Sequence, residues 1–179
     1  MKDQDALLEQ FVASFEKLDE LWTSKEIDPI AWELGVGEVD EYGHRNWRPL
    51  KVRTDRSSLE PLYTKLPGRF PPLFELLALS YRWAEVDLRA FRLLPNPPGT
   101  DLAGLFEQNS GDPGLYEALI PAGYVQFGRG PDLDYDPVCF DIKRRKKNGD
   151  CPVVKIDHEE ILCNYRVKVV GEIAHRLRN

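Results

Sequence analysis

The sequence of 179 residues has few of the residues that build disulfide or metal frameworks. It contains three cysteines, three histidines and one methionine. Cys139, Cys151 and Cys163 are an odd number, and their spacing forms neither a disulfide framework nor a CxxC pair. We therefore expect free, largely buried thiols. We also expect no metal site, no cofactor and no disulfide.

Long apolar runs are also missing. No stretch approaches the ~20 apolar residues that a transmembrane helix requires. The first five residues include two aspartates, whereas a signal peptide begins with basic residues and continues with an apolar run. These absences, together with reduced cysteines, predict a cytoplasmic protein with no membrane partner.

What the sequence does have is the composition of a soluble globular protein. Hydrophobic residues make up 42% and charged residues 30%, and there is no low-complexity tract. A chain of this length buries roughly 70% of its unfolded surface without help from metals or disulfides. We see no linker longer than a loop, so we expect one domain over residues 1–179.

Charge is distributed unevenly along the chain. The net charge is −6, but residues 1–142 carry −11 and residues 143–179 carry +5. An acidic body argues against nucleic-acid binding and suits a basic protein partner. Five cations are consecutive at 143–147, which we interpret as the solvated end of a hairpin.

The first 65 residues are predicted to form a helix followed by an irregular extension. Apolar residues at helical spacing predict a helix over 4–23, capped by Asp3. Residues 24–45 are rich in Gly, Asp and Glu and are predicted to be irregular. A short edge strand over 47–54 and a brief helix from Ser57 or Ser58 to Tyr63 follow.

Residues 66–175 contain the clearer elements. An almost wholly apolar run after Pro71 and Pro72 predicts a buried helix over 71–81. The last segment, 165–177, has a helical apolar face, although its valines also suit a strand. The elements predicted between these two are one or two strands over 84–94, helices over 102–108 and 113–119 capped by Asp101 and Asp112, strands over 124–128, 138–142 and 153–156, and a helical turn capped by Asp157.

This order of elements predicts an α+β fold. Neighbouring strands with short links pair antiparallel, so we expect an antiparallel sheet of about four to six strands flanked by helices. Phe127 and Phe140 should be buried in it. Adjacent strands should carry Val125, Phe127, Val138, Phe140, Val154 and Ile156.

No motif carries a catalytic signature. Gly128-Arg129-Gly130-Pro131 lacks the third glycine and the following helix of a phosphate-binding loop. Cys139 lies in an apolar strand pattern, which is typical of a packed thiol rather than of a nucleophile with His158 as its base. We therefore expect no catalytic residues.

A proline-bracketed acidic loop is the main candidate for partner binding. Asp132, Asp134, Asp136 and Asp141 have some of the spacing of a calcium loop, but the required Gly and Glu are missing. We instead expect an exposed loop in which Asp132, Asp134 and Asp136 surround Tyr135 and attract a cationic partner. Trp83, at the end of the apolar helix, is a further candidate, with core packing as the alternative.

An ordered set of motifs resembles the SUKH superfamily, in the branch related to the yeast cell-wall-assembly regulator. The resemblance covers residues 66–175 as a family-like core. It implies an α+β domain with an antiparallel sheet and no catalytic activity, and bacterial members are immunity proteins that bind toxins. The residues that carry it are Leu66-Pro67, Phe70-Pro71-Pro72, Tyr81-Arg82-Trp83, residues 123–128 (GYVQFG) and 135–141 (YDPVCFD), Pro152-Val153-Val154, and residues 157–162 (DHEEIL).

Three functions follow as hypotheses. The first is a non-enzymatic, immunity-type domain that neutralises a basic toxin domain, such as a nuclease, by direct binding. The second is a regulatory scaffold that binds an endogenous partner protein. The third and most remote is a hydrolase that uses the carboxylates between Asp132 and Asp141.

Overall fold

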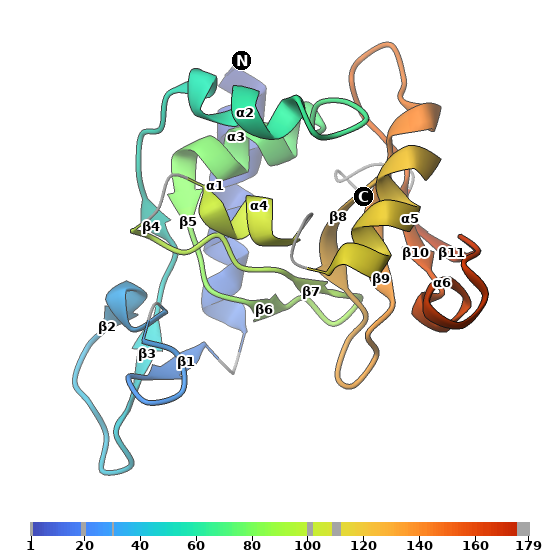
Figure 1. Ribbon diagram of the computed structural model, residues 1–179. Coiled ribbons are helices and arrows are strands. Elements are labelled where there is room, and N and C mark those ends of the chain that lie inside the picture. The colour runs from blue at the N-terminus through green and yellow to red at the C-terminus, as the bar shows by residue number, and fades with distance from the viewer. Residues whose placement is uncertain (1, 19–20, 30, 100–101, 109–111, 175–179) are drawn as a thin grey trace.

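Figure 1 shows the computed structural model of the chain, which describes residues 2–18, 21–29, 31–99, 102–108 and 112–174. Its centre is a six-stranded antiparallel sheet with the strand order β11-β10-β9-β8-β7-β6. The strands are β6 (Val86–Asp87), β7 (Arg92–Leu93), β8 (Tyr124–Arg129), β9 (Pro137–Asp141), β10 (Val153–Ile156) and β11 (Val169–Ala174). The α+β fold class predicted from the sequence is confirmed.

The three central strands are those that period-2 spacing predicts. Val125 lies opposite Phe140 between β8 and β9, and Val153 lies opposite Phe140 between β10 and β9. Phe127 and Phe140 are buried and stack with their ring centroids 3.9 Å apart. Side chains alternate between the two faces of a strand, so successive residues of β9 enter different cores.

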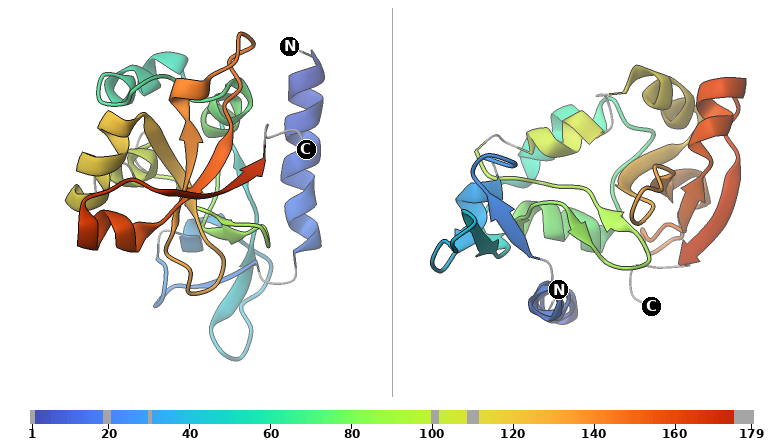
Figure 2. Two further views of the ribbon diagram at one scale, coloured as in Figure 1. Left: turned by 90° about the vertical axis from the view of Figure 1, so that its right-hand side faces the viewer. Right: turned by 90° about the horizontal axis from the view of Figure 1, so that it is seen from below.

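Helices cover both faces of the sheet. Figure 2 (left) shows α1 (Lys2–Ser14) on one side and α5 (Pro113–Ala122) and α6 (His158–Asn164) on the other. The larger core joins α1 and α3 (Pro72–Ser80) to Val138 and Phe140. The smaller core joins α5 and α6 to Cys139. The sheet is therefore sandwiched between two helical layers.

The capping residues of the helices in the second half of the chain explain where these helices begin and end. α3 begins at Pro72, where a missing N–H costs no helical hydrogen bond, and ends where Tyr81 becomes extended. Asp112 caps α5 by accepting from the N–H groups of Gly114 and Leu115, and Gly123 ends it with φ 88°. In α6, Asp157 accepts from the Glu160 N–H. These elements were predicted, as were β6 and β7.

The N-terminal helix is shorter than predicted. α1 begins at Lys2, so Asp3 lies within it, and a 3-10 turn (Phe15–Lys17) follows. The chain then becomes extended at Leu18. Trp22, which the spacing placed on the helix, starts strand β1 (Trp22–Ser24) instead.

Residues 24–45 are more regular than predicted. β1, β3 (His44–Trp47) and β2 (Gly35–Val36) form a separate sheet with the order β1-β3-β2. A 3-10 turn (Ala31–Leu34) precedes β2, and the Arg45 guanidinium lies 3.9 Å from the centre of the Trp32 ring. We call residues 22–47 the arm. Its tip projects from one end of the molecule in Figure 1.

Shorter elements connect the arm to the main sheet. β4 (Leu50–Lys51) pairs with β5 (Tyr81–Arg82). β4 is shorter than the edge strand predicted over 47–54. Asp55, not Ser57 or Ser58, caps the next turn through its carboxylate. A 3-10 turn (Arg56–Leu59), α2 (Glu60–Tyr63), α4 (Ala103–Gln108) and a 3-10 turn (Ile142–Arg144) complete the described elements.

The last segment is a strand rather than the predicted helix. β11 pairs antiparallel with β10, and this pairing decides between the helix that the apolar spacing fits and the strand that the valines suit. Asp101, predicted as a cap, and positions 175–177 of the predicted final helix lie outside the described residues.

Candidate binding groove

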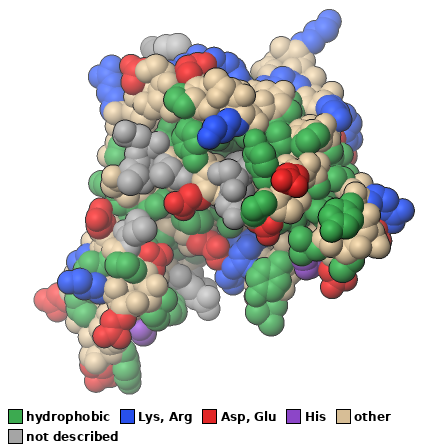
Figure 3. Space-filling view, in the orientation of Figure 1, with side chains coloured by type: hydrophobic (Ala, Val, Ile, Leu, Met, Phe, Trp, Pro, Cys, Tyr) green, Lys and Arg blue, Asp and Glu red, His purple; other side chains and the backbone are tan. Residues whose placement is uncertain are grey.

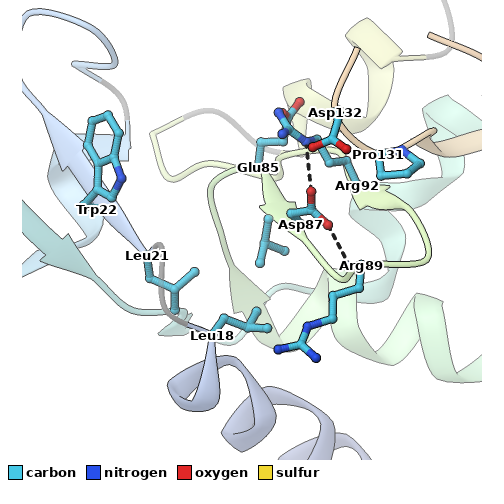
Figure 4. A pocket seen from close by; sticks show the side chains of 10 residues that line it. Leu18, Leu21, Trp22, Glu85, Asp87, Arg89, Arg92, Pro131 and Asp132 are labelled. Carbon is cyan, nitrogen blue, oxygen red and sulfur yellow. Dashed lines mark hydrogen bonds and ion pairs between the residues drawn. The ribbon is translucent and has the colours of Figure 1, made fainter. Parts of the chain in front are cut away.

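A groove of about 590 Å³ lies at the end of the molecule from which the arm projects. One wall is apolar and comes from Leu18, Leu21 and Trp22. The opposite wall is polar and comes from the β6–β7 hairpin and from the β8–β9 loop (residues 130–136), as Figure 4 shows. The groove thus joins three segments that are far apart in the sequence.

Three charges of the polar wall (Glu85, Asp87 and Arg92) and the neighbouring Arg129 neutralise one another. Arg92 bridges Glu85 and Asp87, with its Nη1 3.2 Å from Glu85 Oε1 and its Nε 3.5 Å from Asp87 Oδ2. Arg129 Nη2 lies 2.9 Å from the same Glu85 oxygen. Burial disfavours the Arg92 cation, but the two carboxylates outweigh burial and raise its pKa. This cluster stiffens the wall.

Two further charges stand at the ends of the same wall. Within the described parts of the chain, the side chains of Asp132 and Arg89 form no ion pair. Asp132 belongs to the β8–β9 loop and Arg89 to the tip of the β6–β7 hairpin, and both have positive φ (52° and 67°). The Arg89 N–H donates to Asp87 Oδ1 at 2.6 Å, which fixes the hairpin tip.

The apolar wall offers a half-exposed indole. Trp22 is 48% exposed and its ring contacts that of His44, with the centroids 4.6 Å apart and the planes tilted by 35°. Leu21 is buried and Leu18 is partly buried against the core. A large aromatic side chain that is held in place but open to solvent is a typical anchor for a binding partner.

The predicted acidic loop is only partly free. Asp134 Oδ2 pairs with Lys155 Nζ at 2.6 Å, and Asp136 Oδ1 lies 2.7 Å from His158 Nδ1. Asp136 also accepts from the His158 N–H at 3.0 Å. The expectation of three free aspartates around Tyr135 is therefore corrected: Asp134 and Asp136 anchor the loop, and Asp132 alone faces the groove. Tyr135 remains 59% exposed.

Trp83 is not available to a partner, which corrects its place among the candidate binding residues. It is 1% exposed and its Nε1 donates to the Leu94 carbonyl at 2.9 Å. Its ring contacts Phe74 at a centroid distance of 6.4 Å. A buried indole with a satisfied N–H belongs to the core, which was the alternative interpretation.

The other reactive side chains are in structural positions. Cys139 is buried in β9, and burial raises the pKa of its thiol, which disfavours the thiolate that a nucleophile requires. Cys151 is also buried, whereas Cys163 is exposed, so only two of the three thiols are buried as predicted. Asp141 pairs with Arg144 Nε at 2.7 Å. Across the described residues, no group of three or more His, Cys, Asp or Glu side chains is arranged to hold a metal.

Most residues of the groove were missed by sequence reasoning. Asp132 was among the candidates, but Trp22 was assigned to a helix, and Glu85, Asp87, Arg89 and Arg92 were seen only as parts of a strand pattern. The available signal was a charged residue at nearly every second position between 85 and 92. Such alternation shows that one face of a strand is polar, but not what lies opposite it.

Comparison with known proteins adds no similarity: no family model, no curated protein and no solved structure matches this chain. Within the part of the chain that is described, no helix is both long enough and apolar enough to cross a bilayer.

Proposed function

We propose that this chain is a cytoplasmic, non-enzymatic protein-binding domain of the immunity type, which neutralises a basic toxin domain by direct binding. The motifs that resemble the SUKH superfamily support this role. The groove and the surfaces around it supply a physical basis for binding.

One observation carries the proposal: two projections with exposed apolar side chains flank the groove. The arm carries Tyr42 (76% exposed) and Ile27 (70%), and the β8–β9 loop carries Leu133 (82%) and Tyr135. Both projections extend from the same end of the molecule in Figures 1 and 2. Exposed apolar groups that gather around a concave site are typical of protein-binding surfaces.

Electrostatics favours a basic partner. Residues 22–47 contain six acidic and two basic residues, which gives the arm a net charge of −4. Figure 3 shows acidic and hydrophobic side chains together at its tip. A surface of this kind accelerates the approach of a cationic protein and then buries apolar contacts against it.

The hydrolase alternative receives less support from the same region. Asp134, Asp136 and Asp141 are paired with Lys155, His158 and Arg144. Carboxylates that act in hydrolysis have to be free to exchange protons or to meet a substrate. Ion pairs and hydrogen bonds within the fold are typical of a structural role.

A growth assay tests the immunity role. Each gene adjacent to that of this chain is expressed in a host with and without the chain. We expect one neighbour to be toxic alone and this chain to restore colony formation. Tyr42→Ala should weaken the rescue, whereas Leu162→Ala, on exposed α6, should not. No rescue from any toxic neighbour, or stable binding to a non-toxic host protein, contradicts immunity; the latter supports the regulatory scaffold.

A further inference from the structure

The two walls of the groove run alongside each other, and their residues follow in order. In Figure 4 the apolar wall passes from Trp22 through Leu21 to Leu18. The polar wall passes in the same direction from Asp132 through Asp87 to Arg89. A ligand that touched both ends of this groove would have to be elongated.

The groove also lies between two sheets. Trp22 begins β1, which is an outer strand of the three-stranded sheet, and Asp87 ends β6, which is an outer strand of the six-stranded sheet. Val86, which is buried, also lines the groove. The space is therefore a channel between two sheets with one apolar side and one polar side.

The charges of the polar wall that form no ion pair among the described residues give the two ends of this channel opposite signs. Glu85 and Asp87 are balanced by Arg92 and Arg129, whose distances to them lie between 2.9 and 3.5 Å. The charges left to meet a ligand are Asp132 at one end and Arg89 at the other. A ligand complementary to the wall carries a cation and an anion at opposite ends.

We propose that the groove binds an extended segment of the protein partner. A basic side chain of that segment pairs with Asp132, an acidic side chain pairs with Arg89, and apolar side chains between them lie against Trp22, Leu21 and Leu18. This inference rests on the proposed function and specifies how the partner is recognised.

Peptide chemistry meets these requirements better than the alternatives. An extended chain places successive side chains on opposite faces, so it can offer apolar groups to one wall and charged groups to the other. Nucleic acid would bring phosphates to Asp132 and to the carboxylates of Glu85 and Asp87. A peptide segment needs only one charge of each sign.

The test uses five-residue peptides as probes. Ac-KVLVE-NH₂ and its reverse, Ac-EVLVK-NH₂, cover both chain directions, and Ac-QVLVQ-NH₂ is the neutral control. Binding is followed in ¹H–¹⁵N spectra by the indole N–H of Trp22, assigned with Trp22→Phe. We expect one charged probe to shift this signal with millimolar affinity and the neutral probe, which loses both ion pairs, to bind about fivefold more weakly, within the usual range for two exposed ion pairs.

Charge reversal makes the test specific. In Asp132→Lys the bound charged probe should lose affinity about fivefold, and a probe with acidic residues at both ends, Ac-EVLVE-NH₂, should regain it. Glu117→Lys makes the same charge change on α5 and should have no effect. Circular dichroism shows whether each variant is folded.

Two results would overturn the inference. The first is an unshifted Trp22 signal with every probe up to about 10 mM, which is about tenfold above the millimolar dissociation constant expected for the charged probe. The second is equal affinity for charged and neutral probes, or no regain in Asp132→Lys. If the toxin identified by the growth assay binds while the probes do not, the inference fails and the proposed function stands. If neither binds, both fail.

Discussion

At the scale of single residues, the aspartates of the β8–β9 loop have different roles although they lie within five consecutive positions. Asp136 holds the loop to the start of α6 and to Lys155, and Asp132 points its charge toward the groove. The sequence predicted the loop and its acidity. It could not show which aspartate is paired, because Lys155 and His158 come from elements about twenty residues further along.

Asp136→Asn should destabilise the protein, whereas Asp132→Asn should not. The first change weakens the ion pair with Lys155 and the hydrogen bonds with His158 of a carboxylate that is 16% exposed, and should lower the free energy of unfolding by about 1–2 kcal/mol. The second changes an exposed residue and should stay within about 0.5 kcal/mol. Urea denaturation measures both. Equal effects would contradict the division of roles.

Asp134 should make the stability of the protein depend on acid pH. Burial opposes its ionisation, but hydrogen bonds from Lys155 Nζ and from the Asp136 N–H outweigh burial and lower its pKa below 3.8. A carboxylate with a lowered pKa stabilises the fold above the unfolded value and loses this effect as pH falls through the folded value.

We therefore expect wild type to be more stable than Asp134→Asn at about pH 5, and the difference to disappear near about pH 2. Urea melts of both proteins over this range measure it. Asp132→Asn, which removes a carboxylate of the same loop that has no ion pair among the described residues, is the control and should show no such trend. A difference that persists at the lowest pH would refute the assignment.

The three thiols should react in two classes. Cys163 is exposed on α6, whereas Cys139 and Cys151 are buried, and burial raises the pKa of both. A thiol reagent should modify Cys163 in the folded protein and the other two only after denaturation, because the thiolate is the reacting form. Peptide mass spectrometry locates the labels. Rapid labelling of Cys139 without denaturant would show that β9 opens.

At the scale of elements, what could be predicted depended on how many apolar residues an element contains. α3 and the strands β8 to β10 are built from buried apolar residues, so their periodicity was clear. β1, β2 and β3 are short, and several of their residues are polar or exposed, so no periodicity marked them. β11 was ambiguous because spacings of three residues fit a helix, and pairing with β10 decides its conformation.

A substitution of Gly123 tests whether α5 has to end at this residue in a left-handed conformation. Its φ is 88°, and a Cβ there would meet the Lys143 side chain. Gly123→Ala should lower the free energy of unfolding by about 1–2 kcal/mol, the cost of a left-handed conformation for a residue with a Cβ.

Gly171→Ala is the matched control for this change. Gly171 lies in β11, and a Cβ added there has no heavy atom within 4 Å, so its effect should stay within about 0.5 kcal/mol. Thermal and urea melts compare the two variants with wild type. A neutral Gly123→Ala would mean that the end of α5 relaxes to another conformation.

At the scale of the whole molecule, the groove could not be predicted because it belongs to no single segment. The apolar wall, the β6–β7 hairpin and the β8–β9 loop meet only after the arm has folded beside the main sheet. Charge at this scale was easier to anticipate. The acidic arm and the basic hairpin at 143–147 lie at opposite ends in Figure 1, so the asymmetry of the sequence becomes an asymmetry in space.

This charge distribution predicts how binding responds to salt. Glu38 and Glu41 are exposed near the tip of the arm, so the double change Glu38→Gln/Glu41→Gln removes two charges without touching the core. Association with the toxin found by the growth assay should slow by about three- to tenfold at low salt, and its salt dependence should flatten. Dissociation should change less, because steering acts before contact.

Glu117→Gln, an exposed acid on α5, is the control, since it removes one acidic charge far from the groove. Stopped-flow mixing at low and at about 0.15 M salt, where charges are screened beyond about 8 Å, separates the two rate constants. If the arm variant and the control associate equally fast at low salt, the arm does not guide the encounter. Recognition then has to rest on contacts within the groove alone, where Trp22 and Asp132 would carry it.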